Sequence, residues 1–167
     1  MRSLEPPDSF HLEAAQGWLE LGDHIEAEKE LDRITPQLRA HPDVLVVHWL
    51  VCAKAEKWSV AFEIARTLVE QQPESPFGWI HQAYALRRMA GAGIQSARDA
   101  LLPAADKFPN EPTISFNLAC YACQLGKLKE AYDWLQKAID LDDKNEIKAR
   151  ALNDLDLEPL WPKISEL

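Results

Sequence analysis

The sequence lacks a long apolar run. Its longest apolar stretch, from Val44 to Ala53, is interrupted by His48 and is too short to cross a bilayer. The first ten residues contain Arg2, Glu5 and Asp8 and have no apolar segment of the kind that a signal peptide needs. We therefore expect a cytoplasmic protein.

Cysteine is scarce. The three residues, Cys52, Cys120 and Cys123, are an odd number and lie within apolar helical patterns, which favours free thiols in a reducing compartment. Cys120 and Cys123 form a C-x-x-C motif, which can be a redox pair or half of a zinc site. The motif falls in the middle of an expected helix and has no second ligand pair. We favour buried or groove-lining thiols, with a redox or metal function as the alternative.

Positive charge is also in short supply. The chain has 18 Lys and Arg against 27 Asp and Glu, a formal net charge of −9. Its only dense cationic spot is the pair Arg87 and Arg88. Because an acidic chain repels phosphate backbones, this composition argues against nucleic acid as a partner.

Motifs for catalysis and cofactor binding are missing. The sequence has no G-x-S-x-G, Walker loop, G-x-G-x-x-G or H-E-x-x-H. Its five histidines have no metal-ligand spacing, and the acidic cluster Asp140, Asp142 and Asp143 lacks the pattern of a calcium loop. We predict no enzyme activity, no cofactor and no metal.

What the sequence does contain is a repeat. Four alanines, Ala27, Ala61, Ala97 and Ala131, follow one another at intervals of 34, 36 and 34 residues. Each is followed by a small or apolar residue at offsets of four and seven, which places all three on one face of a helix. A second series of short segments, centred on residues 15, 49, 83 and 119, has similar spacing. It predicts another helix before each helix that carries one of the four alanines.

Turn and loop residues separate these helices. Glycines at 22, 91, 93 and 126 fall between the two helices of a pair, where a left-handed residue ends a helix. Prolines at 42, 73, 76, 109 and 112 fall between pairs, where proline starts the next helix. The pattern predicts an all-α fold with about 34 residues in each helix-turn-helix unit. An ordinary helical bundle without repeats is the alternative.

These residues resemble the tetratricopeptide repeat (TPR) family. The fourth unit matches best, with Asn117-Leu118-Ala119, Gly126, Leu128, Glu130-Ala131, Leu135 and Ala138 in the family's positions. The resemblance implies a right-handed α-α superhelix (a TPR solenoid) of four repeats, at residues 8–41, 42–75, 76–111 and 112–145. Residues 146–167 would then be a C-terminal cap, and residues 1–167 a single domain. Pro36 and Pro103 depart from the pattern, and we expect a kink or shift at each.

The resemblance also implies a groove that holds a protein partner. The family's groove positions fall on Leu12, Gln16, Leu19, Val46, Leu50, Phe77, Ile80, Tyr84, Arg87, Phe116 and Cys120. This set is mostly apolar, so we expect a hydrophobic or amphipathic partner segment. It does not provide the two-carboxylate clamp of TPR chaperone adaptors. The alternative is that the tail or a second copy of the chain covers this surface.

The segments 14–43 and 77–81 are similar to compact bacterial TPR proteins of the kinesin-light-chain type, which accompany bacterial tubulins. This resemblance implies a scaffold protein that binds a cytoskeletal, tubulin-like filament and tethers it to membrane. Net charge would not steer an acidic chain to acidic tubulin or to anionic lipid, so such contacts would be local. A self-assembling structural element remains the other hypothesis.

Overall fold

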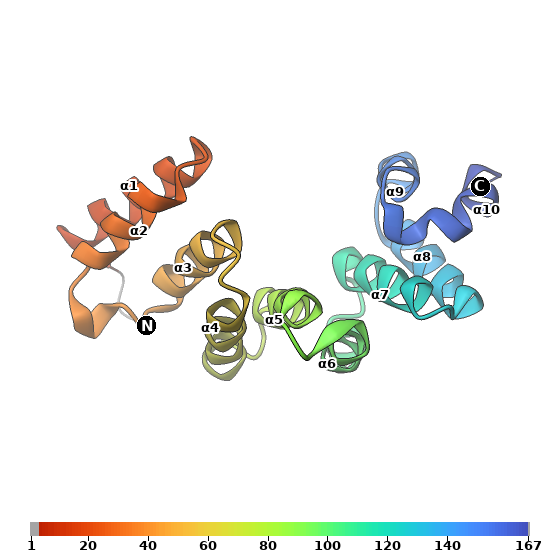
Figure 1. The fold of residues 1–167 in the computed structure, drawn as a ribbon, viewed down its shortest axis with the longest axis horizontal. Helices are drawn as coiled ribbons and strands as arrows, with labels where there is room; N and C mark the ends of the chain where they lie inside the picture. Colours follow the sequence, from red (N-terminus) through yellow and green to blue (C-terminus); the bar gives the residue numbers. More distant parts are fainter. Residues whose placement is uncertain (1–3, 167) are drawn as a thin grey trace. The chain divides into compact units, whose positions relative to one another are not determined.

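The computed structural model describes residues 4–166, and within this range it contains helices and turns but no β-strand (Figure 1). The predicted all-α helical-repeat fold is confirmed. The chain divides into two compact units on either side of the His81–Gln82 bond, and each is described by itself. Residues 1–3 and 167, the ends of the predicted single domain, lie outside the described range, and the single-domain assignment stays a prediction.

The first unit is built from helix pairs. It contains α1 (Asp8–Glu20), α2 (His24–Arg33), the 3-10 helix η1 (Pro36–Leu38), α3 (Pro42–Lys54), α4 (Trp58–Gln71) and the start of α5 (Pro76–Arg88). α1 packs on α2, α3 on α4, and α3 also contacts both helices of the first pair. The turn from α1 to α2 explains this pairing. Gly22 takes φ +84°, and the Asp23 carboxylate caps α2 by accepting from the backbone N–H of Ile25 and Glu26 at 3.1 and 3.0 Å.

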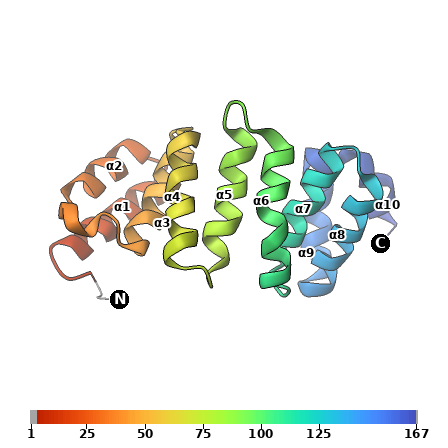
Figure 2. The ribbon, with the colours of Figure 1, turned by 90° about the horizontal axis from the view of Figure 1, so that it is seen from below.

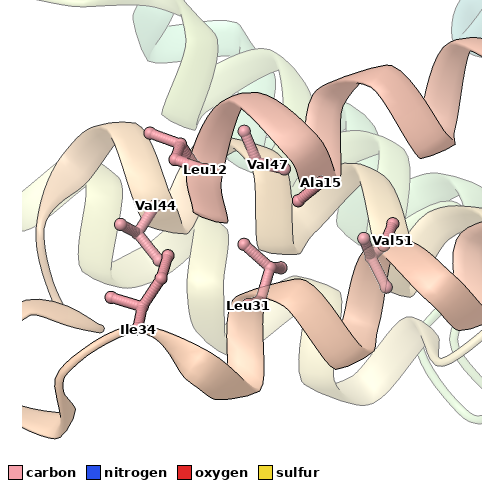
Figure 3. Close-up of a cluster of buried hydrophobic side chains, with 8 residues drawn as sticks. Leu12, Ala15, Leu31, Ile34, Val44, Val47 and Val51 are labelled. Atoms are coloured by element: carbon pink, nitrogen blue, oxygen red, sulfur yellow. The ribbon is translucent and has the colours of Figure 1, made fainter. Parts of the chain in front are cut away.

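The core of the first unit lies where α1, α2 and α3 meet. Figure 3 shows side chains from the three helices pointing toward one another, and the buried cluster comprises Leu12, Ala15, Ala27, Leu31, Ile34, Val44, Val47 and Val51. A buried carboxylate closes the first pair. Asp8 accepts from the backbone N–H of Thr35 at 2.6 Å and from its hydroxyl at 3.1 Å. The start of α1 is thereby tied to the loop that follows α2.

The second unit holds the rest of α5 together with α6 (Gly93–Lys107), α7 (Pro112–Gln124), α8 (Leu128–Leu141), α9 (Lys144–Leu152), η2 (Leu155–Leu160) and α10 (Trp161–Ser165). α7 packs against α6 and α8, and α8 against α9 (Figure 2). Each predicted repeat range holds two of the α-helices between α1 and α8. Nine of the residues of α7 are buried, and all of these except Ser115 are hydrophobic. α7 is therefore the central helix of this unit.

The C-terminal segment after α9 folds back onto α7. η2 packs on α7, and α10 contacts both η2 and α9. Leu157, Leu160 and Ile164 from this segment are 0%, 4% and 0% exposed. Burying each such side chain contributes about 1.5–3 kcal/mol, so the three together hold the segment by several kcal/mol. The Trp161 indole N–H adds a hydrogen bond to the Ala151 carbonyl at 3.0 Å.

The two prolines that depart from the repeat pattern are accommodated differently. Pro36 starts η1, where a proline has no hydrogen bond to lose. Pro103 lies inside α6, which continues to Lys107, and its ring is on an exposed side of the helix. Because proline has no backbone N–H, the carbonyl one turn earlier in α6 loses its helical hydrogen bond. On this exposed side of the helix, water can bond that carbonyl instead. No helix within residues 4–166 is long and apolar enough to cross a membrane.

Gly78 provides a test of the packing in the first unit. A Cβ at this position in α5 would lie 2.9 Å from the Val69 backbone nitrogen and 3.0 Å from Val69 Cγ2. We expect Gly78→Ala to lower the free energy of unfolding by about 1–3 kcal/mol, because the clash involves backbone that cannot move aside. Chemical denaturation followed by circular dichroism measures this change.

Gly17 is the matched control. It also lies inside a helix, α1, but a Cβ there would meet no atom within 4 Å. Gly17→Ala should raise stability by about 0.5–1 kcal/mol through helix propensity alone. Equal effects of the two substitutions would contradict the close approach of α5 to α4.

Candidate functional site

The groove residues predicted in the first unit differ widely in exposure. Leu12 is buried in the core and presents no free surface, and Leu19 is half-buried and packs against that core. Gln16 is exposed and Leu50 is 39% exposed, and both are accessible to a partner. The remaining three, Val46, Phe77 and Ile80, are half-buried.

Phe77 belongs to an aromatic cluster in the first unit. Its ring stacks on His81 with centroids 3.7 Å apart, and Trp49 meets the His81 ring edge-on at 4.2 Å. Burial lowers the pKa of His81, and a hydrogen bond between its Nδ1 and the Phe77 carbonyl at 2.8 Å only partly opposes this effect. Burial therefore favours the neutral form of the His81 ring in this cluster.

In the second unit the structure brings three of the four predicted residues to one pocket. This pocket has a volume of about 600 Å³ and lies between α5, α7, α9 and the start of η2. It is lined by Tyr84, Arg87, Arg88, Asn117, Cys120, Tyr121, Arg150, Asn153, Asp154, Leu155 and Asp156. The fourth predicted residue, Phe116, is 1% exposed beneath Arg150. Cys120 is 3% exposed, so neither of these two side chains presents a surface to a partner.

An ion pair fixes the C-terminal segment at this pocket. The Arg87 guanidinium donates to both carboxylate oxygens of Asp156, with Nη2 to Oδ1 at 2.6 Å. The Gln124 amide donates to the Asp156 carbonyl at 3.2 Å. Burial lowers the pKa of Arg87, but the hydrogen bond and the charge of Asp156 outweigh it and raise the pKa above its ordinary value. Arg87 is thus a structural clamp on η2 and is not available as a groove cation.

Two aspartates and a thiol come together beside this ion pair. Within residues 4–166, Cys120, Asp154 and Asp156 place three potential metal ligands within 4.8 Å of one another. The residues do not fit a metal ion well. Asp156 already binds Arg87, and Cys120 donates its thiol proton to Asp154 at 3.6 Å. Burial, followed by the charges of Asp154 and Asp156, raises the pKa of Cys120, which disfavours the thiolate that a metal requires.

Aromatic rings support the other two arginines of the pocket. The Arg88 guanidinium lies 3.7 Å from the Tyr84 ring centroid, and that of Arg150 lies 3.8 Å from the Phe116 ring centroid. A guanidinium stacked on a ring keeps its N–H donors at its edges, and Arg88 Nη1 donates to the Tyr84 carbonyl at 3.5 Å. The pocket therefore combines apolar surface with directed hydrogen-bond donors.

Sequence reasoning missed the contribution of the C-terminal segment to the pocket. It identified Tyr84, Arg87 and Cys120 but not Arg150, Asn153, Asp154 or Asp156. One signal was present, since Asp154 and Asp156 flank a leucine next to a capping helix that carries an arginine. Nothing in the repeat pattern indicated which helix face this segment would cover.

The likeness to known proteins lies in the fold. The chain resembles the crystal structure of TTC0263, a thermophilic TPR protein of Thermus thermophilus, with a TM-score of 0.71 and 20% identity; the likeness covers 96% of this chain and 100% of that one. It also resembles the structure of a mutant of MamA, with a TM-score of 0.63, 21% identity and coverage of 81% of this chain and 77% of that one. The TPR fold implied by the sequence is confirmed. No protein-family model and no curated protein sequence matches the chain.

The burial of the three cysteines predicts slow thiol chemistry. Burial raises the pKa of Cys52 to about 11 and also raises the pKa of Cys120 and Cys123. For Cys52, a rise from 9.0 makes the thiolate fraction at pH 8 about a hundredfold smaller. We expect a disulfide reagent such as DTNB to react with all three thiols far more slowly in the native protein than in denaturant. A thiol that reacts as fast as free cysteine would contradict this prediction and reopen the redox hypothesis for the C-x-x-C motif.

Proposed function

We propose that the chain is a non-enzymatic interaction module that binds a segment of another protein. The observation that carries this proposal is the open pocket of the second unit, where Tyr84 on α5 is 36% exposed and Arg150 on α9 lines the same pocket. The TPR fold supports it, because helical repeats provide extended surfaces for protein partners. The poorly ionised thiols also support it, since they are weak nucleophiles.

The chemistry of the pocket favours an amphipathic partner segment. Tyr84 and Leu155, the latter 73% exposed, offer apolar contact at the pocket, and Arg150 offers hydrogen-bond donors beside them. Segments with both apolar and polar side chains satisfy such a surface better than a wholly apolar segment. In the first unit, Gln16 and Leu50 are exposed and remain proposed contact residues.

The experiment is a quantitative binding assay with the purified chain and its captured partner. Truncating an aromatic at the centre of an interface costs about 2 kcal/mol or more, so Tyr84→Ala should weaken binding at least about thirtyfold. Leu102→Ala is the matched control, because Leu102 is also 36% exposed but lies on α6 outside the pocket. Equal binding by the two variants would refute the pocket as the contact surface.

A bacterial tubulin filament is the specific partner to test first, in the cytoplasmic setting that the sequence predicts. Sedimentation of the chain with polymerised bacterial tubulin, with and without Tyr84→Ala, tests this hypothesis, and addition of lipid vesicles tests membrane tethering. The chain staying in the supernatant at all filament concentrations would exclude tubulin. Light scattering over a wide concentration range separates these outcomes from self-assembly, which a strict monomer would rule out.

A further inference from the structure

We propose that the pocket of the second unit binds a carboxylate of an acidic partner segment, and that Arg150 is the residue that holds this carboxylate. The inference rests on the proposed protein-binding function and adds the chemistry of the partner. Arg150 lies on α9, outside the four predicted repeats, so the site is formed jointly by α5 and α7 of the repeats and by the capping segment.

Arg150 has the properties of a preorganised carboxylate ligand. Its guanidinium packs on the Phe116 ring, which is itself 1% exposed and therefore fixed in the core. Among the residues that the structure describes, no carboxylate forms an ion pair with Arg150. A planar guanidinium that is held by a ring and has its N–H edges open can bind a carboxylate through two parallel hydrogen bonds.

Asn117 lies in the same pocket and supplies a second donor. Its side chain is half-buried, and within residues 4–166 it has no hydrogen-bond partner. An amide that is half-buried without a partner gains free energy from any ligand that accepts a hydrogen bond from it. Arg150 and Asn117 together therefore give the pocket hydrogen-bond donors for which the described part of the chain provides no acceptor.

The pocket's own carboxylates do not accept hydrogen bonds from Arg150 or Asn117. Asp156 is engaged by Arg87, and Asp154 accepts from the Cys120 thiol at 3.6 Å and from the Asp156 backbone N–H at 3.0 Å. The Arg87–Asp156 pair already shows, within this pocket, a guanidinium that binds a carboxylate through two parallel hydrogen bonds. We assign the same kind of contact to Arg150 and an incoming carboxylate.

The apolar side chains at the pocket favour a peptide over a small anion. Tyr84 and Leu155 are both exposed there, and they would contact an apolar side chain next to the bound carboxylate. We therefore assign the partner an acidic side chain adjacent to a leucine or another large apolar residue.

The test measures fluorescence anisotropy of a short labelled peptide with alternating Glu and Leu, added to the full chain. A peptide with Gln in place of each Glu is the matched probe. Loss of charge-assisted hydrogen bonds costs about 1.5–3 kcal/mol, so the Gln peptide and the Arg150→Gln variant should each weaken binding by about tenfold or more. Arg150→Lys should restore only part of the loss, because a lysine keeps the charge without the fork.

Lys129→Gln is the control variant. Lys129 is exposed on α8 outside the pocket, and its substitution removes the same charge. Because Arg150 is exposed, the melting temperature should change little in either variant, and circular dichroism checks this. Inorganic phosphate should compete only weakly, since it lacks the apolar contact.

Each outcome decides the inference. Equal affinities of the Glu and Gln peptides, or equal effects of Arg150→Gln and Lys129→Gln, would overturn it, and so would competition by phosphate as strong as that by the Glu peptide. Absence of binding by the Glu peptide would overturn it as well. If Tyr84→Ala still weakens partner binding in that case, the proposed function stands and only the acidic chemistry fails.

Discussion

The close approach of helices through alanine is the constraint on which both units depend. Ala27, Ala61, Ala97 and Ala131 begin the stripes of α2, α4, α6 and α8, and all four are 0% exposed. A larger side chain at such a position would hold the paired helices apart and strain the packing around it. Gly78 imposes the same condition more severely, because even a methyl group would meet backbone there. Small residues at fixed intervals thus determine where helices can pair.

The C-terminal segment determines which surface remains for a partner. Leu157, Leu160 and Ile164 fill the space beside α7, and the Arg87–Asp156 ion pair fixes the start of η2. A half-buried ion pair contributes less to stability than the apolar burial does, since desolvation offsets much of its attraction. Its role is to set the position of the segment, and this position creates the pocket that Tyr84, Asn117 and Arg150 line.

The sequence was sufficient to predict the fold because the fold depends on local signals with a period. Alanine spacing, glycine turns and prolines at helix starts each act within a few residues, and they agree with one another. The candidate site was only partly predictable. Tyr84 and Arg87 follow from their place in a repeat, but Arg150, Asp154 and Asp156 reach the pocket because a segment without the repeat pattern folds back on α7. Such long-range packing depends on side-chain shape across elements, which spacing along the chain does not encode.

The placement of η2 on α7 has a consequence for the order of events during protein synthesis. α7 leaves the ribosome before the segment that covers it, and at typical synthesis rates the delay is roughly a few seconds. During this interval the face of α7 that packs on η2 lacks its cover. The nascent chain therefore exposes an apolar surface that the mature chain conceals, and a chaperone or partner acting at that stage meets a different binding face.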